Sequence, residues 1–146
     1  MAFIQSVSCR EGKLMLGLEC LAVAVFFEAR DQPLTGQYAV AEVVMNRVAD
    51  PRWPNTICGV VFQDRQFSFT HDGKSDRMET YAKDDVIEWR AMNQARTIAS
   101  EVFDGGYTEL EATHYHSLSV RPSWAKHYYK VGRIGDHVFY TAPQGK

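Results

Sequence analysis

Hydrophobic residues recur at helical spacing through most of the first hundred positions of the chain. The pattern predicts helices over residues 13–29, 35–48, 56–62 and 84–103. Thr35 and Thr56 stand where a side chain can cap the helix that follows. In the 84–103 segment we expect Val86 and Trp89 to belong to the buried side. Residues 66–70 alternate in the manner of a strand edge, and the polar residues 71–76 end that segment.

The last forty residues have a different pattern, with short runs of β-branched and aromatic residues. Extended segments are predicted over residues 112–117, 128–134 and 137–141. Gly135 and Asp136 form a tight turn between the last two. Helices followed by a small antiparallel sheet define the α+β class. With no repeat or linker visible, we expect residues 1–146 to form one catalytic domain, with its core at about 13–141.

Composition excludes several classes of protein. The 146 residues carry 16 basic and 18 acidic side chains, for a net charge of −2. A nucleic-acid-binding protein normally has a basic surface, so no nucleic-acid partner is expected. The longest apolar stretch, residues 21–27, is too short to span a bilayer, so no stable membrane insertion is expected. The first twenty residues lack the pattern of a secretory signal, and we expect synthesis in the cytoplasm without an export address.

The three cysteines, Cys9, Cys20 and Cys58, are too few and too scattered for a disulfide framework or a zinc site with paired ligands. We expect all three to be reduced. Cys20 and Cys58 are then small core residues.

Glu28 is the most informative residue of the first predicted helix. It follows Val25 by three positions and Leu21 by seven, so it shares their apolar stripe. Burial penalises the ionised carboxylate and raises its pKa, as a general acid near neutral pH requires. Geometry alone leaves open a pairing with Arg30 or Arg47, or simple exposure at the helix end.

Seven sequence blocks resemble the SleB-like cell wall hydrolase family, which includes spore-cortex-lytic enzymes and related phage lysins. They stand in family order between about residues 18 and 140. The blocks are LAVAVFFEAR at 21–30, GQYAVAEVVMNRV at 36–48, PNTICGVV at 54–61, QFS at 66–68, ATHYH at 112–116, VRPSWA at 120–125 and RIGDHVFY at 133–140.

The resemblance implies a lysozyme-like helical body with a small antiparallel sheet beside the cleft. It also implies cleavage of peptidoglycan glycan strands between N-acetylmuramic acid and N-acetylglucosamine, with Glu28 as the catalytic acid. Family members commonly read Glu-Ala-Arg-Gly-Glu, whereas this chain has Asp31 and Gln32 after Arg30. Gln32 therefore removes one carboxylate beside the acid.

Hydrolysing glycosidases usually place two carboxylates across the bond. Glu42 falls on the opposite side of its helix from the apolar valines, and we expect it to face solvent. Asp64 and Asp72 in loops stay open as second carboxylates. A single acid suits lytic transglycosylation, in which the sugar's own C6 hydroxyl is the nucleophile. We therefore favour that reaction over hydrolysis by a muramidase.

Four polar residues are expected to bind the substrate: Gln66, Ser68, Thr113 and Tyr115. In a strand, Thr113 and Tyr115 share one face, and His114 and His116 share the other. Phe67 and Phe69 are expected in the core. Trp124 suits either stacking on a sugar or packing beneath the sheet.

A second hypothesis is a metal-dependent amidase that cuts the stem peptide. His114 and His116 could ligate zinc together with His71 and Asp72, although spacing fixes no third ligand. A wall-binding module without activity is a third reading, but it gives no reason for an acid on an apolar stripe. We favour an enzyme without cofactor or metal.

The remaining expectations concern biology. The partner is the peptidoglycan glycan strand, and the protein is expected to be a monomer. A wall-cleaving enzyme without an export signal suggests a phage endolysin, which reaches the wall after release through a holin-type pore.

Overall fold

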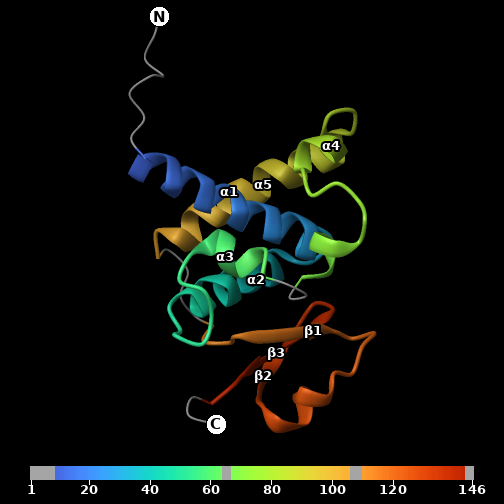
Figure 1. The fold of residues 1–146 in the computed structure, drawn as a ribbon. Coiled ribbons are helices and arrows are strands. Elements are labelled where there is room, and N and C mark those ends of the chain that lie inside the picture. The colour runs from blue at the N-terminus through green and yellow to red at the C-terminus, as the bar shows by residue number, and fades with distance from the viewer. Residues whose placement is uncertain (1–8, 64–66, 106–109, 144–146) are drawn as a thin grey trace, which may run out of the picture.

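The structure is a computed structural model that describes residues 9–63, 67–105 and 110–143. Its elements, in chain order, are α1 (Cys9–Ala29), α2 (Leu34–Val48), α3 (Ile57–Val61), the 3-10 helix η2 (Ser68–His71), α4 (Met78–Ala82), α5 (Val86–Phe103), β1 (His114–Ser117), the 3-10 helix η3 (Ser123–His127), β2 (Tyr129–Ile134) and β3 (His137–Thr141). The helices form one layer and the sheet lies beneath it (Figure 1). This arrangement confirms the predicted α+β class.

Helix α1 is the centre of the helical layer and packs against α2, α3 and α5. Its residues from Leu21 to Phe26 are fully or almost fully buried, because α1 has a neighbour on several sides. The contacts include Phe27 of α1 stacked on Phe69 of η2, with ring centroids 5.0 Å apart. The segment after α3 therefore closes over the end of α1 that carries Glu28.

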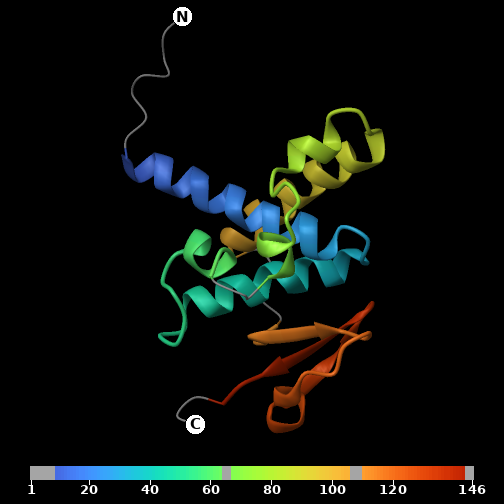
Figure 2. The same cartoon turned by 45° about the vertical axis from the view of Figure 1, so that its right-hand side comes forward.

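Helix α2 lies between α1 and the sheet (Figure 2). Ala39, Val40 and Val43 of α2 form a second apolar cluster with Ala112 and Phe139 from the sheet side. Both faces of α2 are consequently buried. Glu42 is only 3% exposed, so the expectation that it faces solvent is wrong. Periodicity suggested one buried stripe, whereas this helix is covered on both sides.

The sheet has the order β1-β3-β2, with both pairs antiparallel. The register places Tyr115 opposite Phe139 and Ser117 opposite His137. Gly135, in the turn between β2 and β3, has φ +59°. A Cβ there would lie 2.5 Å from Oε1 of Gln32, so both the conformation and the space require glycine.

Gln32 ties this turn to the turn between α1 and α2. Its Oε1 accepts a hydrogen bond from the backbone N–H of Asp136 at 2.8 Å. Its Nε2 donates to carboxylate oxygens of Asp136 and Asp31, each at 3.2 Å. The amide of Gln32 thus fastens the sheet to the helical layer.

Most predicted elements are confirmed, including the cap that Thr56 provides by accepting from the N–H of Gly59. Thr35 is not a cap, because α2 begins at Leu34 after Pro33 and has no side-chain cap. Residues 68–71 form η2 and not a strand edge. Phe67 and Phe69 are buried as expected, since apolar residues two positions apart can both be buried in a strand or in a 3-10 helix.

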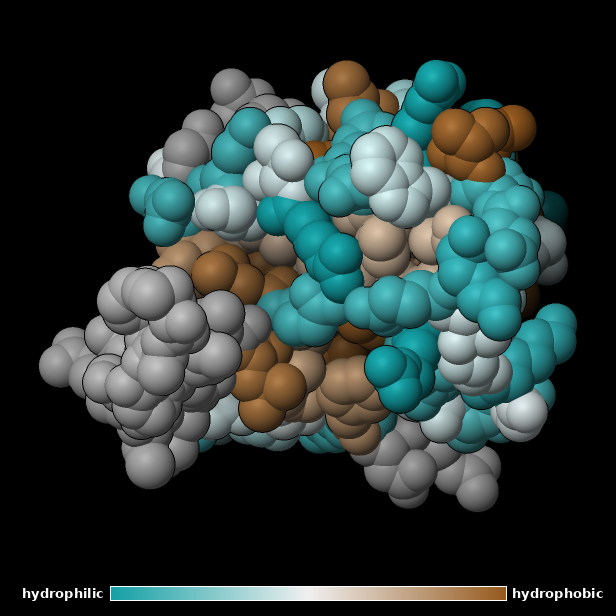
Figure 3. Space-filling view, turned by 90° about the horizontal axis from the view of Figure 1, so that it is seen from above, coloured by the Kyte–Doolittle hydropathy of each residue, from teal (hydrophilic) through white to brown (hydrophobic). Residues whose placement is uncertain are grey.

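The start of α5 also differs from the expectation. Val86 and Trp89 are 60% and 52% exposed, so they do not belong to its buried side. In the view of the helical layer from above, opposite the sheet, hydrophobic residues appear in separate groups among hydrophilic ones (Figure 3). Among the described helices, none is long and apolar enough to cross a bilayer.

Cys20 and Cys58 form a disulfide, with their Cα atoms 5.3 Å apart. The expectation that both thiols are reduced is therefore wrong. The bond links α1 to α3 across 38 positions of sequence, which spacing alone does not reveal. The prediction that Cys20 is a small core residue is confirmed, since this residue is 6% exposed.

Candidate active site

A cleft of about 610 Å³ opens between the end of α1 and the sheet. The helical side supplies Phe27 and Glu28 of α1, Arg47 of α2 and Ser68 of η2. The sheet side supplies residues 114–117 of β1 and His137 of β3, and the connection to β2 adds Val120, Pro122 and Trp124. A volume of this order is typical of sites that bind small molecules.

Glu28 lies on the wall of this cleft, one residue before the end of α1. Burial raises the pKa of its carboxyl group above the ordinary value. The hydrogen bond from Tyr115 and the positive charge of Arg47 both act against that increase. The balance favours a protonated carboxyl group to a higher pH than in water, as predicted from the apolar stripe.

Tyr115 donates its phenolic hydrogen to Oε1 of Glu28. Burial, and then the charge and the hydrogen bond of Glu28, raise the pKa of Tyr115 well above the ordinary value. The phenol consequently stays protonated to a higher pH than an ordinary tyrosine does. It fixes one oxygen of Glu28 and leaves the other for a ligand.

Arg47 reaches the cleft from inside the protein, where it is 5% exposed. Its Nε donates to the carbonyl oxygen of Thr113 at 2.7 Å. The neighbouring Asn46 donates to the carbonyl oxygens of Leu110 and Ala112 at 2.8 and 2.9 Å. These bonds hold the segment that leads into β1 against the end of α2, and so they place Tyr115 opposite Glu28.

The four expected substrate-binding residues have different locations. Tyr115 and Ser68 line the cleft. Thr113 is 7% exposed, does not line the cleft, and its hydroxyl lies 3.0 Å from Nδ1 of His114. Gln66 lies outside the described residues. The sequence therefore identified part of this wall, and it misplaced Thr113 because the segment before β1 runs beneath α2.

Sequence reasoning named Tyr115 for the cleft and left Trp124 open between stacking on a sugar and packing beneath the sheet, and both line the cleft. It did not place Phe27 or His137 there. The His114 ring contacts Trp53, Trp124 and Tyr128, with centroid distances of 5.6, 5.1 and 4.8 Å. Burial, with smaller contributions from Arg47 and Arg52, lowers the pKa of His114 to about 4. A strand-face argument separated this histidine from Tyr115, but both line the cleft.

The proposed metal ligands are not brought together. Nδ1 of His116 lies 2.8 Å from the carbonyl oxygen of Ser117, and Nε2 lies 2.9 Å from the Tyr140 hydroxyl. Asp72 accepts a hydrogen bond from the backbone N–H of Lys74. In the described part of the chain, no three His, Cys, Asp or Glu side chains cluster as metal ligands would.

Glu28 is the single carboxylate among the described residues that line the cleft. Of the carboxylates considered from sequence, Glu42 is buried in α2, Asp72 is exposed and Asp64 lies outside the described residues. Arg30 does not pair with Glu28, because its Nε lies 2.9 Å from Oε1 of Glu88. The described cleft therefore offers one acid.

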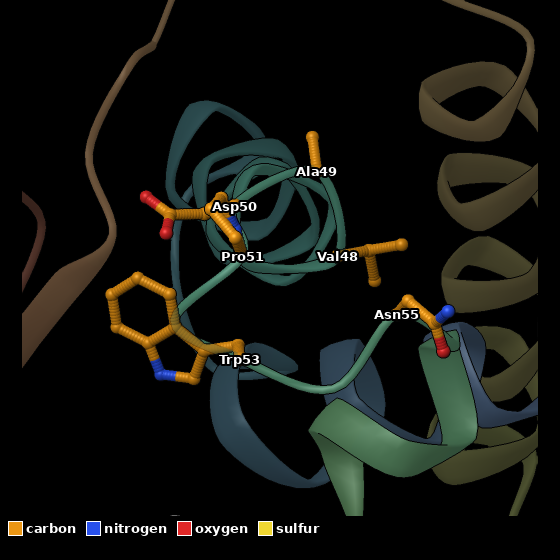
Figure 4. Close-up of a pocket in the computed structure, with 6 residues that line it drawn as sticks. All are labelled: Val48, Ala49, Asp50, Pro51, Trp53 and Asn55. Atoms are coloured by element: carbon orange, nitrogen blue, oxygen red, sulfur yellow. The ribbon is translucent and has the colours of Figure 1, made fainter.

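A second cavity, of about 460 Å³, lies where the chain passes from α2 to α3. Asp50 and Trp53 lie on one side of this connection, and Val48 and Asn55 lie on the other (Figure 4). The Asp50 carboxylate is held by Arg52, with Oδ2 and Nη2 2.8 Å apart. With that carboxylate paired, the cavity has no counterpart of Glu28.

Comparisons with known proteins add independent findings. Residues 31–140 match the model of a family described as cell wall hydrolase, a range that begins three residues after Glu28. The chain is 31% identical to the spore cortex-lytic enzyme of Bacillus subtilis over 123 residues, which are 84% of this chain and 36% of that protein. Identity to the spore cortex-lytic enzyme of Halalkalibacterium halodurans is 32%, over 84% of this chain and 34% of that protein. The chain thus spans about a third of the length of these two relatives.

A solved structure is also similar. The catalytic domain of the germination-specific lytic transglycosylase SleB from Bacillus anthracis aligns with a TM-score of 0.63 and 28% sequence identity. The alignment covers 86% of this chain and 93% of that domain. The fold described above is therefore shared with this catalytic domain.

Proposed function

The chain belongs to the cell wall hydrolase family, and on that premise we propose that it is a peptidoglycan lytic transglycosylase with Glu28 as its acid and base. The observation that carries the proposal is the position of Glu28. Its carboxyl group lies in a cleft, burial raises its pKa, and Tyr115 holds one of its oxygens. The similar solved structure is named as a lytic transglycosylase, which supports this choice of reaction.

The reaction proceeds at the bond between C1 of N-acetylmuramic acid and O4 of N-acetylglucosamine. Glu28 donates its proton to the glycosidic oxygen as the C1–O4 bond breaks, and positive charge develops at C1. The C6 hydroxyl of the same muramic acid forms a bond to C1. The ionised Glu28 then accepts the hydroxyl proton, so a 1,6-anhydro ring forms and the acid is regenerated.

One carboxylate suffices for this sequence of steps. The nucleophile belongs to the substrate and is held close to C1, so no second carboxylate is needed to activate water. Arg47 supports the second half of the reaction, because its positive charge stabilises Glu28 once the proton has left. Tyr115 does the same through its hydrogen bond.

The test is digestion of purified peptidoglycan, with mass spectrometry of the released fragments. We expect 1,6-anhydro ends from the wild-type protein and a loss of about 10³-fold with Glu28→Gln, because a general acid contributes about 10² to 10⁴. Glu101→Gln is the matched control, since Glu101 is exposed and lies on α5, away from the cleft. Reducing ends would instead indicate hydrolysis, and full activity of Glu28→Gln would end the assignment. Loss of activity with a chelator would favour the amidase hypothesis.

We also propose that the protein acts as a phage endolysin, made in the host cytoplasm and released to the wall through a holin-type pore. The Cys20–Cys58 disulfide suits a protein that works outside the reducing cytoplasm. In an infected or expressing culture, we expect the protein to stay inside intact cells until a pore former is present. Its appearance outside unlysed cells without a pore former would contradict this proposal.

A further inference from the structure

His137, the first residue of β3, has no role in the mechanism above, yet it lines the same cleft as Glu28. His137 is 7% exposed, so more than nine-tenths of its surface is buried. Its Nδ1 is sealed from solvent and has no hydrogen-bond partner among the described residues. Buried ring nitrogens are normally paired, so an unpaired one beside a cleft needs an explanation.

The unpaired Nδ1 indicates which of the two ring nitrogens carries the hydrogen. A buried N–H without an acceptor is costly, and so is a buried positive charge. Burial accordingly lowers the pKa of His137, although Asp31 and Asp136 act to raise it and His116 acts to lower it. The favoured form is the neutral imidazole with its hydrogen on Nε2, because Nδ1 then exposes no orphaned donor.

The location of the ring relates it to the reaction. The His137 and Tyr115 ring centroids are 5.0 Å apart, and Tyr115 donates to Glu28. A donor beside Tyr115 is thus near the bond that Glu28 protonates. In the aminosugars of peptidoglycan, the acetamido group is on C2, next to the anomeric carbon of that bond. Its carbonyl oxygen is the strongest neutral acceptor in that part of the sugar.

We propose that His137 is a substrate-binding residue whose Nε2–H donates to the 2-acetamido carbonyl oxygen of the sugar at the cleavage site. The proposal rests on the function proposed above and deepens it, because it makes the acetamido group a recognition element. The other charged residues of the cleft suit a ligand that carries a hydrogen-bond acceptor. Arg47 adds positive charge, and Glu28 is the single carboxylate among the described residues that line the cleft.

The first experiment compares His137→Phe with the wild-type protein on soluble glycan strands. Phenylalanine keeps a flat ring and removes both nitrogens, so the thermal midpoint should be unchanged or higher. We expect kcat/KM to fall about 10- to 100-fold, mainly through KM. His137→Gln, which restores an N–H donor, should recover part of the loss. His127→Phe is the matched control, because His127 is exposed on η3 and does not line the cleft.

The second experiment tests which substrate group is bound. Glycan strands are de-N-acetylated and then re-acylated with either acetyl or trifluoroacetyl groups, which are both neutral but differ in the acceptor strength of the carbonyl. The ratio of the two kcat/KM values should be larger for the wild-type protein than for His137→Phe. Effects on the chemical step itself act on both proteins alike and cancel in this comparison.

Three results would be decisive. An equal ratio for the two proteins would overturn the acetamido contact, and an unchanged kcat/KM for His137→Phe would overturn any binding role. An equal loss on both substrates with a lowered thermal midpoint would indicate a structural role and likewise overturn the proposal. If the wild-type protein does not cleave strands at all, the proposed function fails first.

Discussion

The Tyr115 hydroxyl on β1 donates a hydrogen bond to Oε1 of Glu28 at the end of α1, across 87 positions of sequence. This bond joins the helical layer to the sheet at the wall of the cleft. It also connects two groups whose acidities affect each other, since the hydrogen bond lowers the pKa of Glu28 while Glu28 raises that of Tyr115. The bond therefore couples the position of the acid to its strength.

Tyr115→Phe should raise the pKa of Glu28 further, because burial then acts without the opposing hydrogen bond. A general acid with a higher pKa stays protonated to a higher pH. The alkaline limb of kcat/KM against pH should therefore move upward, and the maximal rate should fall about 10-fold as the carboxyl group loses its orientation. Tyr129→Phe is the control, since Tyr129 is 70% exposed. An alkaline limb that stays in place would disprove the coupling.

His114 predicts a particular dependence of stability on pH. In the unfolded chain the ring binds a proton below its ordinary pKa of 6.5, whereas the folded protein keeps it neutral down to about 4. Stability from this group is therefore complete above pH 6.5 and is lost as the pH falls towards 4. Because the ring is partly exposed, we expect a loss of about 1 kcal/mol.

Urea unfolding at pH 7.5 and pH 4.5 measures this effect. The decrease in unfolding free energy between the two values should be smaller for His114→Gln than for the wild-type protein. His127→Gln, at an exposed position, should retain the full decrease. If both variants behave alike, His114 is not the source.

The disulfide between Cys20 and Cys58 should contribute substantially to stability. Closing a loop of about 39 residues lowers the conformational entropy of the unfolded chain. In the chain-entropy description this raises the free energy of unfolding by about 4 kcal/mol. The double variant Cys20→Ser, Cys58→Ser, or the wild-type protein in reductant, should lose about 10 °C in thermal midpoint. Reductant should have no further effect on the double variant. An insensitive wild-type midpoint would be inconsistent with a bond that stabilises the fold.

Gln32→Glu should destabilise this chain by about 1 to 2 kcal/mol near neutral pH. The new carboxylate would lose the two donated hydrogen bonds and face the carboxylates of Asp31 and Asp136. These neighbours raise its folded pKa, so the loss of stability should appear as the pH rises and vanish in acid. Adding Asp136→Asn to this variant should recover part of the lost unfolding free energy. Equal unfolding free energies of Gln32→Glu and wild type at pH 7 would contradict this interpretation.

Local patterns predicted the parts of the fold that depend on neighbours in sequence. The spacing of apolar residues predicted α1 and α5, and Gly135 marked the turn between β2 and β3. The same spacing placed Glu28 on a buried stripe and so indicated a raised pKa, which the structure confirms. The organisation as one catalytic domain and the monomeric state remain predictions.

These local patterns could not predict contacts between segments that are distant in sequence. Periodicity showed one apolar side of α2, but α1, α3, α5 and the sheet all pack around this helix, and Glu42 is buried although it lies off the apolar stripe. The strand-face argument placed Thr113 in the cleft with Tyr115, whereas Arg47 holds the Thr113 carbonyl beneath α2. Cys20 and Cys58 gave no local sign of their bond.

The sequence by itself determined the long helices, the extended segments near the C-terminus and which helix carries the candidate acid, because these depend on interactions within a few residues. Only the tertiary structure decided what surrounds that acid. Tyr115, Arg47 and His137 come to Glu28 from 19 to 109 positions away, and packing between α1, α2 and the sheet sets their approach. The physical reason is that periodicity records which side of an element is buried, whereas the identity of the covering residue depends on how whole elements pack.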